Sequence, residues 1–97
     1  MHIITRRPIS APQARWPRAA SALDDWYRRT RHASWKNFAE IKDTFPAVDT
    51  VAGRYIFDIG GNKIRLIANV RFQGRRVYVL AIFDHNEYEK FKWKQTH

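Results

Sequence analysis

Apolar positions recur at helical spacing in the first half of the chain. The apolar stripe is made by Ala19, Leu23, Trp26 and Tyr27. This i, i+4, i+7, i+8 spacing predicts an amphipathic helix over residues 17–32.

Two short elements are predicted before this helix. A β-branched stretch over residues 2–5 predicts a first strand, and a short helix is predicted over 10–15, with Pro12 in its first turn.

A second, shorter helical pattern follows that helix. Its apolar stripe consists of Phe38, Ile41 and Phe45. Asn37 precedes the stripe and Glu40 follows three residues later, which is close to a capping box and predicts Asn37 as the N-cap. Pro46 predicts the end of this helix.

The second half of the chain alternates with a period of two. The alternation predicts strands over residues 54–59, 63–72 and 75–83. Gly60-Gly61 and Gln73-Gly74 separate these strands and predict tight turns, with glycine where a positive φ is needed. The three strands then form an antiparallel meander. Because the strand over 75–83 is apolar on both faces, we expect it to be the central, most buried one.

The alternation also assigns side chains to the two faces of the sheet. In the middle strand, one face holds Ile64, Leu66, Ala68, Val70 and Phe72, and the other holds Lys63, Arg65, Ile67, Asn69 and Arg71. In the next strand, strict alternation groups Val77, Val79, Ala81 and Phe83 against Tyr78, Leu80 and Ile82. We expect the helices to cover the first face, which leaves the second a partly open, basic surface.

These elements predict one α/β (α+β) domain over residues 1–97. An N-terminal strand and the helices pack on an antiparallel sheet of three to four strands, and a short C-terminal helix follows. Asp84 and Glu87 stand three residues apart where this last helix begins, which predicts Asp84 as its cap. A chain of 97 residues leaves room for one hydrophobic core.

Charge and composition narrow the possible functions. The chain has 18 Lys and Arg against 9 Asp and Glu, and the net charge of +9 favours a polyanionic partner. The absence of cysteine excludes a disulfide scaffold, an iron–sulfur cluster and a thiolate zinc site. The four histidines lack the spacing of metal ligands, so neither a metal nor a cofactor is expected. The apolar runs are far shorter than the roughly 20 residues that span a bilayer.

Four residues could together support metal-free cleavage of RNA by its own 2′-hydroxyl. This reaction needs an acceptor for the 2′ proton, a donor for the 5′ oxygen and fixed cations beside the phosphate. Arg65 and Lys63 can supply the cations, and Arg65 can grip two phosphate oxygens. His85 carries protons near pH 7, and Tyr88, three residues on, can stack on a base or bond the phosphate. From the residues alone, a structural role for His85 stays open, because a lone histidine near a helix start is more often structural than catalytic.

Two motifs resemble HigB-type toxins, which are small bacterial mRNA interferases of the RelE-like superfamily. They are the stretch Phe57-Asp58-Ile59-Gly60-Gly61-Asn62-Lys63-Ile64-Arg65-Leu66-Ile67 and the stretch Asp84-His85-Asn86-Glu87-Tyr88. The resemblance covers nearly the whole chain, although Asp84 stands where the family usually has Thr. It implies a RelE-like fold and a cytoplasmic protein that cleaves mRNA, largely on the translating ribosome. It also implies inhibition by a cognate helix-turn-helix antitoxin of the HigA type.

The resemblance further implies a set of functional residues. The catalytic candidates are Arg65, His85 and Tyr88. Lys63 and Arg54 are expected to assist electrostatically. The remaining substrate or ribosome contacts are expected at Arg71, Arg75, Arg76 and Lys92.

A second class of function also fits part of the pattern. The order α-β-β-β-α in the second half is typical of a double-stranded-RNA-binding domain, which would bind RNA or the ribosome without needing His85 for catalysis. A membrane-surface role for Lys90–Lys94 is disfavoured because this segment is too short for stable anchoring. A helix-turn-helix protein encoded beside this chain would favour the toxin. The sequence leaves open whether an antitoxin plugs the Arg65–His85 site or blocks ribosome entry by its bulk.

Overall fold

The described part of the chain contains five strands and two helices. The structure is a computed structural model, and it describes residues 1–5, 20–61 and 64–84. The elements are β1 (His2–Thr5), α2 (Ala20–His32), α3 (Phe38–Thr44), β2 (Asp49–Val51), β3 (Arg54–Ile59), β4 (Ile64–Arg71) and β5 (Arg76–Asp84). The helices predicted over 10–15 and after Asp84 lie outside the described residues.

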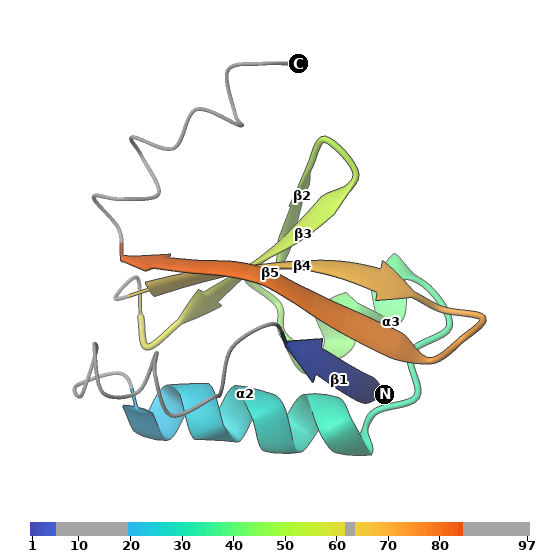
Figure 1. The fold of residues 1–97 in the computed structure, drawn as a ribbon, viewed down its shortest axis with the longest axis horizontal. Helices are drawn as coiled ribbons and strands as arrows, with labels where there is room; N and C mark the ends of the chain where they lie inside the picture. The colour runs from blue at the N-terminus through green and yellow to red at the C-terminus, as the bar shows by residue number, and fades with distance from the viewer. Residues whose placement is uncertain (6–19, 62–63, 85–97) are drawn as a thin grey trace.

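The strands form one mixed sheet in the order β1-β5-β4-β3-β2 (Figure 1). The predicted α+β fold and the antiparallel meander of β3, β4 and β5 are confirmed. The sheet is one strand larger than predicted, because the three-residue β2 pairs with β3. β1 pairs in parallel with β5, and a parallel pair requires a crossover connection, which includes α2 and α3. The central strand is therefore β4, and the expectation that it would be the strand over 75–83 was wrong.

An irregularity in β5 explains why that strand is apolar on both faces. Ala68 of β4 pairs with Val79, but the preceding residue, Ile67, pairs with Ala81. Leu80 is therefore an extra residue in β5, which is the arrangement of a β-bulge. Because side chains alternate with a period of two, one extra residue moves the rest of the strand to the opposite face.

The bulge overturns one sequence-based assignment of faces. Ala81 and Phe83 pack beside Ile56 and Ile67 on the side of the sheet away from the helices. Ile82 instead packs against the core on the helix side. Strict alternation, which grouped Ala81 and Phe83 with Val77 and Val79, fails beyond Leu80.

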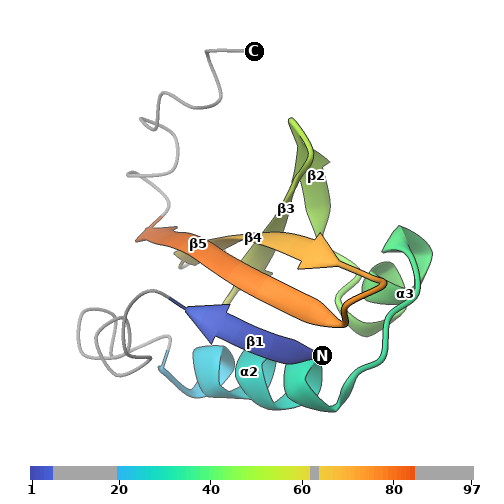
Figure 2. The same cartoon turned by 45° about the vertical axis from the view of Figure 1, so that its right-hand side comes forward.

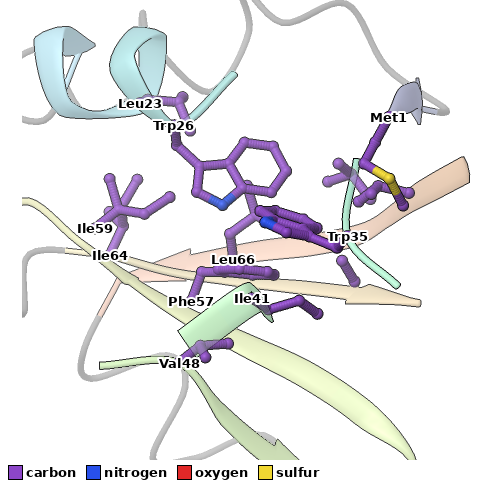
Figure 3. Close-up of a cluster of buried hydrophobic side chains, with 13 residues drawn as sticks. Met1, Leu23, Trp26, Trp35, Ile41, Val48, Phe57, Ile59, Ile64 and Leu66 are labelled. Atoms are coloured by element: carbon purple, nitrogen blue, oxygen red, sulfur yellow. The ribbon is translucent and has the colours of Figure 1, made fainter. Parts of the chain in front are cut away.

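The main core lies between the helices and one face of the sheet (Figures 1 and 2). Both helices contribute to it, through Leu23 and Trp26 of α2 and Ile41 of α3. Trp26 is 2% exposed, and its ring meets Phe57 edge to face with centroids 5.2 Å apart (Figure 3). Such aromatic pairs add stability beyond the burial of their area. None of the described helices has the length and apolarity needed to span a membrane.

The beginning of α3 follows the predicted capping pattern. The Asn37 side chain accepts a hydrogen bond from the Glu40 N–H at 3.0 Å, so its role as N-cap is confirmed. The Glu40 carboxylate accepts from the N–H of Lys36, also at 3.0 Å. In a capping box, the Glu40 side chain would accept from the N–H of the N-cap, Asn37. Here it accepts from the N–H of the preceding residue, Lys36, instead.

The two predicted glycine turns behave differently. Gly60 and Gly61 have φ values of 68° and 61°, as predicted for the first turn. In the second turn, the positive φ of 53° falls on Arg75 rather than on Gly74. This conformation costs a non-glycine residue about 1–2 kcal/mol. The Arg75 carbonyl accepts a 2.6 Å hydrogen bond from the N–H of His2, so the turn joins β1 to the sheet.

Candidate functional site

Arg65 and Asp58 form an ion pair on the face of the sheet opposite to α2 and α3, here called the outer face. They are direct cross-strand partners on β4 and β3, and Arg65 Nη1 lies 3.0 Å from Asp58 Oδ1. The two side chains are only 17% and 23% exposed, respectively. Asp58 therefore holds the Arg65 guanidinium in one orientation in a partly desolvated setting.

Apolar side chains border this ion pair. Phe83 is the residue of β5 opposite Arg65. One row further along the strands, Ile56 and Ile67 are 4% and 2% exposed and pack with Ala81 and Phe83. Water is largely excluded from such a cluster, so the charge of a neighbouring guanidinium is screened less than on an open surface.

The other described basic candidates do not gather around Arg65. Arg54 opens β3, on the same face but four residues before Asp58. Arg71 and Arg76 are cross-strand partners at the far ends of β4 and β5. Arg71 is six residues from Arg65, which corresponds to about 20 Å along a strand. The structure therefore divides the predicted cations between two ends of the outer face.

Arg75 lies in the turn between β4 and β5, beside Arg76. The pKa of the Met1 amino group is lowered, mainly because the group is buried and also because the positive charge of Arg75 repels its protonated form. This amino group donates to the carbonyls of Thr30, Arg31 and Ala33 at the end of α2. The N-terminus, the end of α2 and the β4–β5 turn thus lie at the same end of the molecule (Figure 1).

Four predicted residues lie outside the described part of the chain: Lys63, His85, Tyr88 and Lys92. The register of the sheet nevertheless ends with Asp84 opposite Ile64. His85 is the next residue in the sequence. The roles of these four residues remain predictions.

Sequence reasoning missed Asp58 as the partner of Arg65, although a signal was present. Ile59 and Ile64 form the pair nearest to the Gly60-Gly61 turn. The next pair away from the turn must therefore be residues 58 and 65. The hairpin therefore predicts this pair once its register is known. Within the described residues, no group of three or more His, Cys, Asp and Glu side chains could hold a metal ion.

Comparison with known protein families matches the sequence of this chain to one family. A family model described as the HigB toxin, the RelE-like toxic component of a toxin–antitoxin system, matches residues 19–91. The chain belongs to this family. The match covers α2, α3 and strands β2 to β5 with the turn that carries Arg75.

Curated relatives match along nearly the full length of this HigB-family toxin. A protein named mRNA interferase HigB from Escherichia coli O6:H1 (strain CFT073) is 34% identical over 93 residues, which cover 93% of this chain and 90% of the relative. The mRNA interferase toxin HigB of Escherichia coli K12 is 27% identical over 94 residues, with 94% and 90% covered. An mRNA interferase HigB from Shigella flexneri shows the same identity and coverage.

Proposed function

We propose that this HigB-family toxin is an endoribonuclease that cleaves mRNA without a metal ion. The 2′-oxygen attacks the adjacent phosphorus, and the bond from phosphorus to the 5′-oxygen breaks. The products are a 2′,3′-cyclic phosphate and a free 5′-hydroxyl. The proton of the 2′-hydroxyl passes to a base, and the leaving 5′-oxygen takes a proton from an acid. The names of the relatives, mRNA interferases, support this activity.

The observation that carries the proposal is the Arg65–Asp58 pair. Negative charge builds on the phosphate oxygens as the fifth bond to phosphorus forms, and a cation fixed beforehand stabilises that charge without reorganising. A guanidinium has five N–H donors, so a bond from Nη1 to Asp58 is compatible with a further bond to a phosphate oxygen. The low exposure of both side chains reduces the screening of the Arg65 charge by solvent, while the Asp58 carboxylate offsets part of that charge.

The remaining roles follow the sequence-based assignment. His85 transfers the protons, Tyr88 stacks on a base or bonds the phosphate, and Lys63 adds charge beside Arg65. Arg54 assists electrostatically, and Arg71, Arg75, Arg76 and Lys92 contact the RNA or the ribosome. The natural setting proposed is the translating ribosome in the cytoplasm, and the inhibitor is a helix-turn-helix antitoxin encoded beside the toxin.

The test compares Arg65→Ala with Lys36→Ala, since each removes one positive charge and Lys36 is an exposed residue before α3. Each variant is produced together with the neighbouring gene product, purified, and assayed on mRNA with and without ribosomes. We expect Arg65→Ala to reduce cleavage by about 10²–10³-fold and Lys36→Ala to leave it unchanged. Mapping of 2′,3′-cyclic ends identifies the reaction.

Two results would contradict the proposal. Full cleavage by a folded Arg65→Ala variant would remove Arg65 from the active site. Wild-type protein that binds RNA tightly but never cuts it, with or without ribosomes, would favour the alternative of a non-catalytic RNA-binding module.

A further inference from the structure

A groove of about 500 Å³ crosses the outer face of the sheet over β1, β5 and β4. Tyr78 lies at its centre, because it pairs with Ile4 on one side and with Asn69 on the other. Paired residues of neighbouring strands point to the same face, so these three side chains form one row. Arg71 and Leu80 also line the groove.

The β-bulge in β5 shapes this groove. Leu80 is the extra residue of the bulge, with no residue of β4 opposite it. Bulges re-aim side chains locally, and Leu80 is the large hydrophobic residue that is exposed here, at 39%. The groove therefore combines an aromatic residue, an amide and an arginine with four aliphatic residues, Ile4, Val70, Val79 and Leu80.

Positive charge borders the groove. Arg71 and Arg76 face each other directly across β4 and β5, and His2 pairs with Arg76 from β1. Like charges in this position destabilise a sheet. The ion pairs found among the described residues involve Arg28, Arg29 and Arg65 rather than these two arginines. An anionic ligand would remove the repulsion.

The groove lies between this charged end and Arg65. Asn69 is four residues beyond Arg65 on the same face of β4, about 13 Å away, and Arg71 follows two residues later. An RNA strand with its reacting phosphate at Arg65 would pass over the groove before it reaches Arg71 and Arg76.

We propose that this groove binds one nucleobase of the RNA, with Tyr78 stacking on the base and Asn69 bonding its edge. The inference rests on the proposed RNA cleavage. Single-stranded RNA is recognised in this manner, by stacking of splayed bases on aromatic rings and by hydrogen bonds to their edges. The Asn69 amide offers both donors and an acceptor for that edge. The toxin then has a base preference at a fixed distance from the cut.

A protein segment fits the groove less well. An amphipathic helix needs a continuous apolar stripe on its partner, but Ile4 and Leu80 are separated here by Tyr78 and flanked by polar and cationic side chains. Docking of the antitoxin in the groove is the competing outcome that the experiment must detect.

The experiment uses the full-length protein and an RNA library randomised around the cleavage site. Sequencing of the cleaved ends gives the base preference at each position, and rates on single RNAs give kcat/KM. We expect Tyr78→Leu to lower kcat/KM about 5- to 150-fold, the factor that corresponds to one stacked base. Tyr78→Phe keeps the ring and should retain the rate, whereas Asn69→Ala should flatten the preference at one position. Lys36→Ala is the control.

A binding measurement separates this inference from the proposed cleavage. RNA with 2′-deoxyribose at the scissile position cannot be cut, and its affinity is read by fluorescence anisotropy. If the wild-type protein cleaves no RNA, the proposed cleavage is contradicted. If Tyr78→Leu nevertheless binds this RNA more weakly than the wild type does, the groove is supported. Unchanged rate, preference and affinity in folded Tyr78→Leu and Asn69→Ala would overturn the groove. Loss of antitoxin affinity with unchanged RNA affinity would also overturn it. Asn69 is exposed, so Asn69→Ala remains informative if Tyr78→Leu does not fold.

Discussion

Replacing Asp58 by Ala tests whether the partly buried ion pair matters for both stability and activity. The substitution leaves the Arg65 guanidinium without the carboxylate that lies 3.0 Å away. Exposed ion pairs contribute only about 0.2–1 kcal/mol, whereas breaking a fully buried pair costs about 3–5 kcal/mol. With 17% and 23% of the two side chains exposed, the pair lies between these limits. We expect Asp58→Ala to lower the free energy of unfolding by about 1–3 kcal/mol.

Asp25→Ala is the matched control. Asp25 pairs with Arg28 at 2.6 Å and with Arg29 at 3.6 Å, but these side chains are 40–68% exposed. Loss of Asp25 should therefore cost about 0.2–1 kcal/mol, even though it breaks a shorter contact. Urea unfolding followed by circular dichroism measures both variants, and each kcal/mol corresponds to about 4–8 °C in Tm for a domain of this size.

The same variants test whether Asp58 positions Arg65 for RNA cleavage. If Asp58 acts through Arg65, Asp58→Ala should slow RNA cleavage in the wild-type background and have no effect in an Arg65→Ala background. This non-additivity is the signature of two residues in one network. Equal stability losses for Asp58→Ala and Asp25→Ala would refute the burial reasoning. Additive effects of Asp58→Ala and Arg65→Ala on cleavage would refute positioning.

Three further predictions concern the helices. The Thr30 hydroxyl is buried without a hydrogen-bond partner among the described residues, so Thr30→Val should keep or raise the free energy of unfolding by about 1 kcal/mol, and a clear loss in urea unfolding would contradict this. Asn37→Ala removes the N-cap of α3 and should cost about 0.5–2 kcal/mol, whereas Asn37→Asp should retain most of the stability in the same titration. Burial raises the pKa of Tyr27 above 10.0, so the folded state favours the neutral phenol. Its contribution is complete below pH 10.0 and is lost as pH rises through the raised pKa. Stability measured against pH should therefore fall above 10.0 in the wild type and fall less in Tyr27→Phe.

Local sequence patterns predicted both described helices, four of the five described strands and most of the core. The helical stripe containing Leu23 and Trp26, the Asn37 cap and the glycines at 60 and 61 each act within a few residues, so the sequence alone predicted α2, α3 and the first hairpin. The period of two also placed Arg65 on the outer face of β4, because a regular strand leaves its side chains no other choice.

Only the tertiary structure decided how distant segments combine. The extra residue at Leu80 is invisible to periodicity, because a bulge exists only relative to the hydrogen bonds of the partner strand. The same applies to the parallel docking of β1 on β5, which made β4 the central strand. Asp58 became the partner of Arg65, and Tyr78 the neighbour of Ile4 and Asn69, through cross-strand register. That register depends on the long-range packing and hydrogen bonding of the whole sheet, which local sequence patterns do not encode.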